Sequence, residues 1–301
     1  FEQDPPLHQQ MRSLITHAFS PKMIIGMAPQ IERIVNELLA IIIQRDSFDW
    51  VTDLANPLPV IVMARVLGLP IEEWQQFKTW TDLIVNQNGE QAQAVKHFAH
   101  FFAREIFKRR RKPGTDLLSQ LLFAEIEGER LAYDDLLTFC RTLFVAGNVT
   151  TSRLLGNAML CFIENPQELD RLRQQPELLP GAVEEILRYM SPHLPCPNSN
   201  VINLGRRAKK DVYFYDQLVR QGEQIHISRL SANFDERHFS DPERFDIGRS
   251  PNRHQSFGHG IHYCIGAQLA RLEINITLKC VIQTFQQFQV VPGARVEHQY
   301  S

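Results

Sequence analysis

The chain has 301 residues, and its 32 Lys and Arg against 34 Asp and Glu give a formal net charge of −2. This balance excludes the strongly basic character through which many proteins bind nucleic acid. Hydrophobic residues make up 44% and charged residues 22% of the chain, and no apolar run approaches the roughly 18 residues that a membrane span needs. We therefore expect a soluble globular protein that binds neither nucleic acid nor membranes.

Cysteine usage predicts a reducing compartment. The chain has five cysteines, namely Cys140, Cys161, Cys196, Cys264 and Cys280. Their odd number, their wide spacing and the lack of a secretory signal peptide indicate free thiols and a cytoplasmic protein rather than a disulfide framework. Because no Gly/Ser-rich linker marks a boundary, we expect one domain over residues 1–301.

The first two thirds of the chain are predicted to be helical. After the start signal Asp4-Pro5-Pro6, apolar residues recur at helical spacing up to Phe19. Similar patterns predict further helices over residues 27–44, 57–67, 71–85, 92–110 and 116–124. The basic run 108–112 lies where one of these helices ends, and its cations complement the helix dipole there. We therefore interpret this run as a helix end rather than a nucleic-acid patch.

The longest predicted helix covers residues 133–164 and is ended by Asn165-Pro166. Two shorter helices follow, at 166–174 and 180–189, and three prolines then exclude helix. The remaining predicted elements are strands over 211–219 and 223–228, a loop over 233–253 and a helix from Gly266 to Phe285. The sequence therefore predicts a mainly α protein with a small β part, of the α+β class.

The segment Phe257–Arg271, which reads FGHGIHYCIGAQLAR, carries the most chemical information. Its three glycines allow the backbone to approach something flat and large, and Cys264 stands where helix N–H groups stabilise a thiolate. Such a thiolate can bind a metal. Zinc held by His259, His262 and Cys264 is one alternative, but it has no evident fourth ligand and leaves the glycines unexplained.

This segment resembles the haem-binding loop of the cytochrome P-450 superfamily, soluble bacterial type. The resemblance implies that Cys264 is the axial thiolate ligand of the iron of haem b, with Gly258 and Gly266 beside the cofactor. It also implies that Phe257 packs near the sulfur and that His262 reaches a haem propionate. His259 is left open, either as a loop residue or as a cofactor contact.

Two other segments resemble propionate-binding parts of the family. The start Asp4-Pro5-Pro6 is similar to the beginning of the C helix, and His8 and Arg12, four residues apart on one helix face, are implied to bind propionates. Arg206, five residues before Asp211, matches a further propionate arginine. Arg207 competes for that role, because the connection over 193–205 is longer than usual in the family.

Residues 146–151, AGNVTT, resemble the oxygen-activation segment of the I helix. The resemblance implies that Ala146 and Gly147 make room for dioxygen and that Thr150 supports proton delivery. Helix packing is the alternative explanation for Gly147. Val149 stands where the family usually has an acid, and it can neither carry a proton nor bind water, so we predict slow or uncoupled oxygen activation.

The pair Glu185 and Arg188 matches the Glu-x-x-Arg motif of the K helix, and its implied role is structural. Arg244, in the segment Pro242-Glu243-Arg244-Phe245, matches the arginine that completes this buried network in the family.

The resemblance runs from the C helix through the L helix, and we expect the family's N-terminal part and its last strands to be missing from this chain. It implies a haem-thiolate monooxygenase that inserts one oxygen atom from O2 into a small organic substrate. Electrons would come from NAD(P)H through a separate ferredoxin or flavodoxin and its reductase. The alternatives are a peroxide-using or otherwise atypical haem enzyme, a non-catalytic haem-binding remnant, and the zinc site.

Overall fold

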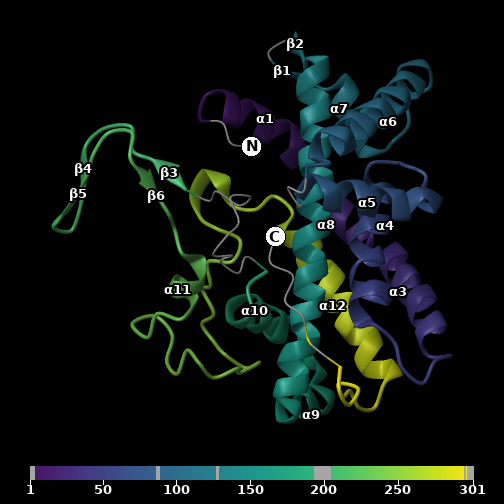
Figure 1. The fold of residues 1–301 in the computed structure, drawn as a ribbon, viewed down its shortest axis with the longest axis vertical. Helices are drawn as coiled ribbons and strands as arrows, with labels where there is room; N and C mark the ends of the chain where they lie inside the picture. The colour runs from purple at the N-terminus through teal and green to yellow at the C-terminus, as the bar shows by residue number, and fades with distance from the viewer. Residues whose placement is uncertain (1–3, 86–88, 127–128, 193–204, 295, 297–301) are drawn as a thin grey trace.

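The computed structural model describes residues 4–85, 89–126, 129–192, 205–294 and 296. A long central helix, α8 (Tyr133–Glu164), runs through the molecule, and other helices pack along it (Figure 1). The helices that precede it are α1 (Leu7–Ala18), α2 (Pro21–Gly26), α3 (Ala28–Ile42), α4 (Pro57–Val66), α5 (Trp74–Val85), α6 (Gln91–Arg111) and α7 (Leu117–Phe123). Those that follow it are α9 (Pro166–Gln174), α10 (Leu179–Tyr189), α11 (Arg229–Asn233) and α12 (Ala267–Thr284). Shorter turns are the π-helical η1 (Val51–Ala55) and the 3-10 helices η2 (Ile71–Glu73), η3 (Pro176–Leu178) and η4 (Gly260–His262).

The long helices follow the sequence prediction closely. The predicted helix over 133–164 coincides with α8, which ends at Asn165, and Pro166 then begins α9. Sequence analysis missed the short elements α2, η1 and α11. Helix α2 is defined mainly by its start, where the Ser20 hydroxyl accepts a hydrogen bond from the Met23 N–H at 3.4 Å. Elements of five or six residues are too short to show a helical repeat of apolar side chains.

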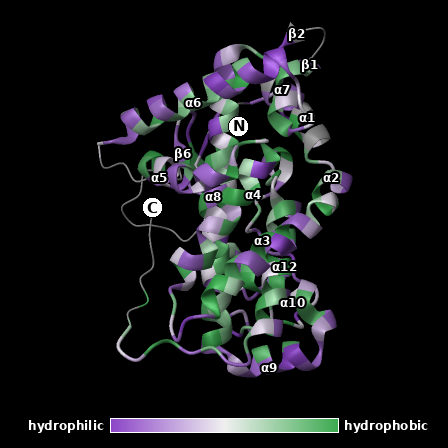
Figure 2. Ribbon diagram, turned by 90° about the vertical axis from the view of Figure 1, so that its right-hand side faces the viewer, coloured by the Kyte–Doolittle hydropathy of each residue, from purple (hydrophilic) through white to green (hydrophobic). Residues whose placement is uncertain are grey.

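An aromatic cluster between α5, α6 and α8 forms much of the core behind the central helix. Its rings are Phe77, Trp80, Phe98, Phe101, Phe102 and Phe144. The closest pair, Phe98 and Phe102, stacks with ring centroids 4.5 Å apart. Burying each phenylalanine contributes about 1.5–3 kcal/mol. In Figure 2, α4 is coloured mainly as hydrophobic, in agreement with its burial, whereas α9 is mainly hydrophilic.

One residue of the basic run at the end of α6 is buried. Arg109 is buried and forms ion pairs at 2.8 Å with both Glu105 and Asp116. It also donates to the carbonyl of Gly68, where the positive φ of +68° favours glycine. The run therefore ends a helix, as predicted, and ties α6 to the loop after α4.

The β part consists of three two-stranded antiparallel ladders in the described residues. They pair β1 (Glu125–Ile126) with β2 (Glu129–Arg130), β3 (Arg206–Arg207) with β6 (Gln224–Ile225), and β4 (Val212–Phe214) with β5 (Gln217–Val219). The single strand predicted over 211–219 is wrong, because the chain turns at Tyr215, whose φ is 54°. The long connection predicted over 193–205 lies outside the described residues, except for Gly205.

Across the described ranges, the helices lack the combination of length and apolar character that a membrane crossing would require.

Candidate active site

The cysteine loop connects η4 to α12 and is closed by a backbone hydrogen bond. The Cys264 N–H donates to the Phe257 carbonyl at 2.9 Å. Gly258 and Gly260 adopt φ values of +73° and +71°, which favour glycine over residues with a Cβ. The loop therefore presents Cys264 just before the first turn of α12, as the glycine pattern predicts.

The surroundings of Cys264 contain cations. The residue is exposed, whereas the other cysteines of the described ranges are buried. Burial of the sulfur by neighbouring atoms raises the pKa of the Cys264 thiol, while the Gly266 N–H and the charges of Arg229, Arg12 and Arg271 act in the opposite direction. These groups favour a thiolate once another positive centre contacts the sulfur.

Helix α1 supplies a buried imidazole next to the loop. His8 is 3% exposed, and neither of its ring nitrogens has a hydrogen-bond partner. Its ring lies 4.4 Å from the His262 ring, centroid to centroid. Burial first, and then the charge of Arg12, lower the pKa of His8, so it is neutral at pH 7 and has one N–H to donate. Leaving buried polar atoms unpaired is costly, and an anionic ligand would supply the missing acceptor.

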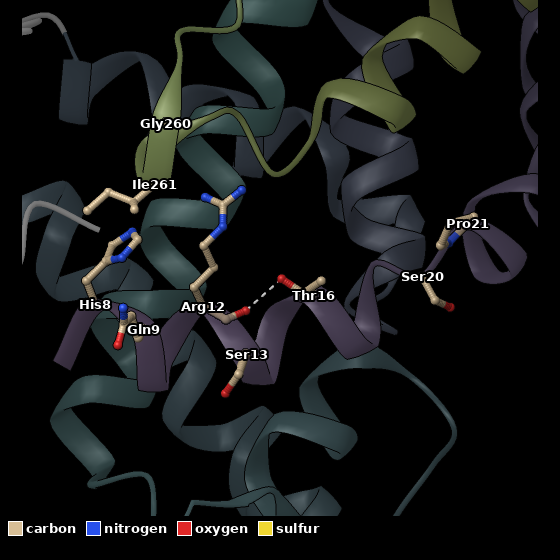
Figure 3. A pocket seen from close by; sticks show the side chains of 9 residues that line it. All are labelled: His8, Gln9, Arg12, Ser13, Thr16, Ser20, Pro21, Gly260 and Ile261. Atoms are coloured by element: carbon tan, nitrogen blue, oxygen red, sulfur yellow. Dashed lines mark hydrogen bonds between the residues drawn. The ribbon is translucent and has the colours of Figure 1, made fainter. Parts of the chain in front are cut away.

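A cavity of about 720 Å³ lies beside this imidazole, between α1 and the η4 segment. It is lined by His8, Gln9, Arg12, Ser13, Thr16, Ser20, Pro21, Gly260 and Ile261. Figure 3 shows His8 and Arg12 extending from α1 toward Gly260 and Ile261. Arg12 forms no ion pair with the described residues, so its charge is available to an anionic group.

Of the two competing arginines in β3, Arg206 is the one that acts on this site. Its charge contributes, after burial and His8, to the lowered pKa of His262. Arg207 instead donates to the Gly222 carbonyl at 2.8 Å. The assignment of Arg206 rather than Arg207 to a propionate stays a prediction.

Sequence analysis missed Arg229. This residue begins α11 and donates to the Ser256 carbonyl at 3.2 Å, but no carboxylate of the described residues pairs with it. Burial first lowers the pKa of Arg229, the thiol of Cys264 acts in the opposite direction, and Arg206 lowers it further. No motif or spacing in the sequence indicates this proximity, because it depends on how the chain folds back after β6.

In α8, the Thr150 hydroxyl donates to the Ala146 carbonyl at 2.8 Å. Ala146 is exposed, and Val149 and Thr150 are partly exposed. Gly147 is different, because a Cβ at this position would lie 2.7 Å from the sulfur of Met63 in α4. Close packing against Met63 therefore gives this glycine a structural explanation, whereas its role in making room for dioxygen stays a prediction; Ala146 is the small residue on the exposed side.

The predicted pair in α10 is present and fully buried. Arg188 donates from Nε and Nη2 to the two carboxylate oxygens of Glu185, each at 2.8 Å. Arg249 donates to both oxygens at 3.1 Å, and Asn252 donates to one of them at 3.0 Å. One carboxylate therefore fixes α10 to the segment that precedes the cysteine loop.

The expectation that Arg244 completes this network with its side chain is wrong. Arg244 is exposed, and only its carbonyl takes part, as an acceptor for Arg188 at 3.2 Å. The next residue, Phe245, takes the inward position at 3% exposure, so the Arg244 side chain points outward. Arg249 occupies the place that the motif assigned to Arg244.

The zinc alternative receives no support from the described residues, among which no group of three or more His, Cys, Asp and Glu could hold a metal ion. The site instead has one exposed cysteine on which the charges of Arg12 and Arg229 act, and a buried, unpaired imidazole that contacts His262. Such a mainly α protein has the residues to hold a large planar ligand that carries a metal and anionic groups.

Comparison with known proteins agrees with this description. The family model for Cytochrome P-450 matches residues 71–300. The putative cytochrome P-450 YjiB of Bacillus subtilis is 41% identical, over 98% of this chain and 76% of its own length. The crystal structure of CYP109E1 from Bacillus megaterium in complex with testosterone gives a TM-score of 0.91 at 39% identity, covering 99% of this chain and 81% of that one. The Bacillus subtilis bacillaene polyketide synthase cytochrome P-450 PksS gives a TM-score of 0.87 at 38% identity, covering 94% and 72%.

The chain belongs to the cytochrome P-450 family. It is an oxidoreductase of the monooxygenase class, whose cofactor is haem and which acts on small molecules with electrons from redox partners. The family and fold predicted from the sequence are confirmed.

Proposed function

We propose that residues 1–301 form a single haem-thiolate monooxygenase domain in which Cys264 binds the iron of haem b. One oxygen atom from O2 is inserted into a small organic substrate, and the electrons come from NAD(P)H through a separate ferredoxin or flavodoxin and its reductase. The observation that carries the proposal is the position of Cys264, which stands before α12 in a glycine loop and is acted on by Arg12 and Arg229, two cations without a carboxylate partner among the described residues. When bound, the haem supplies iron that binds and reduces dioxygen.

The residues of this chain hold the cofactor by charge and hydrogen bonds. His8 and His262 each donate one N–H, and Arg12, Arg206 and Arg229 supply positive charge to the propionates. The remaining contacts come from the loop itself, through Phe257, Gly258 and Gly266. The unpaired nitrogens of His8 support this assignment, because a propionate oxygen satisfies one of them.

Thr150 and Ala146 of α8 would line the space in which the bound haem takes up dioxygen. The Thr150 hydroxyl, which donates to the Ala146 carbonyl, keeps its lone pairs for a hydrogen bond from water. Val149 adds no proton carrier next to it. Proton delivery therefore depends on water ordered by Thr150, which supports slow or uncoupled oxygen activation.

A second candidate function follows from Val149. An enzyme that takes hydrogen peroxide needs no delivery of two electrons or of the protons that reduce O2, so the missing acid costs it less. Product formation with peroxide and with O2 plus a redox partner separates the two. Restoring the acid with Val149→Glu, with Val149→Gln as the uncharged control, raises the product formed per NAD(P)H only if O2 is the oxidant.

The proposed function is tested by the absorption spectrum of the reduced protein with carbon monoxide. We expect the Soret band of a thiolate-ligated haem in the protein and in a Cys280→Ser control, which alters a cysteine within α12. Cys264→Ser removes that band. A band typical of histidine ligation, or an unchanged band in Cys264→Ser, refutes the assignment of Cys264.

A further inference from the structure

Two adjacent glutamates of α10 have different partners. Glu185 binds Arg188, Arg249 and Asn252, as described above. Glu184 binds Arg271 of α12 instead, and contacts His254, which lies just before the cysteine loop. The Glu-x-x-Arg motif therefore accounts for Glu185 but leaves Glu184 without an explanation.

Glu184 and Arg271 form a two-point ion pair. Arg271 donates from Nε to Oε1 at 2.6 Å and from Nη2 to Oε2 at 2.7 Å, so the planar guanidinium lies parallel to the carboxylate. Burial alone would raise the pKa of Glu184, but the hydrogen bonds from Arg271 and His254 outweigh it and lower the pKa to about 2. Glu184 is therefore ionised at physiological pH, and the geometry of Arg271 is fixed.

His254 connects the same carboxylate to the start of the loop. Its side chain is 3% exposed, and its Nδ1 accepts a hydrogen bond from the Ser256 N–H at 3.2 Å. A neutral imidazole that accepts at Nδ1 carries its proton at Nε2. Nε2, which lies 3.1 Å from Glu184 Oε2, is therefore the donor to the carboxylate.

Arg271 in turn contacts two loop residues that precede Cys264. Its guanidinium carbon lies 4.5 Å from the centroid of the Phe257 ring, and its Nη1 donates to the Tyr263 hydroxyl at 3.2 Å. Phe257 is the residue whose carbonyl accepts the Cys264 N–H, and Tyr263 directly precedes the cysteine. A single carboxylate outside the loop is thus connected, through Arg271 and His254, to Phe257, Tyr263 and the start of the loop at Ser256.

We propose that Glu184 is a positioning residue that acts through Arg271 on Cys264. It holds the loop at one orientation, and its negative charge offsets the positive charge of Arg271, which acts on the Cys264 sulfur. This inference rests on the proposed function, in which that sulfur binds haem iron. Without the negative charge, Arg271 favours the reduced haem, which carries one positive charge less.

The test measures the reduction of the haem-loaded protein. In Glu184→Gln we expect the ratio of reduced to oxidised haem at a fixed potential to rise at least about threefold, which is a shift of about 28 mV at 59 mV per tenfold change. The double variant Glu184→Gln/Arg271→Gln removes both charges, so its ratio returns toward the wild-type value. A purely structural role does not predict this return. The matched control is Glu32→Gln, which breaks the exposed ion pair of Glu32 with Lys279 at the other end of α12.

A second variant covers the case in which Glu184→Gln binds no haem. Arg271→Lys keeps the charge but loses the two-point pair and the ring contact, and we expect a smaller share of its carbon monoxide complex to show the thiolate band. If the wild type itself lacks that band, the proposed function fails. If the wild type shows it and the Glu184 and Arg271 variants match the Glu32 control in both measurements, the role of Glu184 is refuted while the proposed function stands.

Discussion

Glu273 gives the chain a pH-dependent stability that can be measured directly. It lies in α12 with a side chain that is 1% exposed, no ion pair within the described ranges and one carboxylate oxygen without a hydrogen-bond partner. Burial raises the pKa of Glu273 from 4.5 to about 8. The folded protein therefore keeps this side chain protonated at pH 7, whereas the unfolded chain ionises it.

The sign follows from the two pKa values of Glu273. Because the folded pKa is the higher one, the stability that Glu273 contributes to the folded protein is fully present below pH 4.5. This stability is lost as the pH rises from 4.5 through about 8. At 1.36 kcal/mol for each pKa unit, the largest loss is roughly 5 kcal/mol. Glu273→Gln has a similar shape and does not titrate, so it removes this loss.

Urea unfolding of the wild type and Glu273→Gln, followed by circular dichroism between pH 5 and pH 9, measures the difference. We expect the free energy of unfolding of the variant to exceed that of the wild type by an amount that grows with pH and levels off above pH 8. The control Glu72→Gln changes an exposed glutamate and shows no such growth. A difference between variant and wild type that is the same at every pH would refute the reasoning.

Three further predictions test the site and its support. Arg229→Gln removes a cation near Cys264, so we expect the dissociation constant of haem, measured by titrating the haem-free protein, to rise at least several-fold. An unchanged dissociation constant contradicts the role of Arg229 at the propionates. Arg249→Ala removes one partner of the buried Glu185 carboxylate, so it lowers the free energy of unfolding by about 3 kcal/mol. Arg244→Ala changes an exposed side chain and lowers it by less than about 1 kcal/mol. Urea unfolding measures both values. Gly147→Ala lowers the melting temperature because the new Cβ crowds Met63. Adding Met63→Ala makes room for this Cβ, so a double-mutant cycle shows that part of the loss is recovered.

The sequence was sufficient for the long helices because they carry many periodic residues and clear ends. Helix α8 has 32 residues and stops before Pro166, so its range was predicted without error. The turn at Tyr215 was missed because no Gly or Asn marks it, although its φ is positive. Local pattern therefore predicts an element when the element is long or when the turn uses the usual residue types.

For the site, the sequence was sufficient to predict residues that belong to one motif in one segment. It was not sufficient to predict contacts between residues that the fold brings together from separate segments. Cys264 and its glycines are neighbours in the chain, so they were recognised as one unit. Arg229 and Arg249 come from separate segments, and their roles depend on which guanidinium reaches which carboxylate. The error with Arg244 has the same origin, since the motif fixes the segment but not the side chain that turns inward.

The arginines near the cysteine loop fall into two groups that differ in charge compensation. Arg188 and Arg271 are each paired by a glutamate of α10, and they hold backbone segments in place. Arg12 and Arg229 have no carboxylate partner among the described residues, and both act on Cys264. After burial, the charge of Arg206 also lowers the pKa of Arg229, so a ligand with negative groups beside these cations would stabilise the folded chain by more than its contacts alone. If Arg12 and Arg229 hold the haem as we propose, haem binding and folding are coupled by charge, and this coupling acts through the arginines that α10 leaves unpaired.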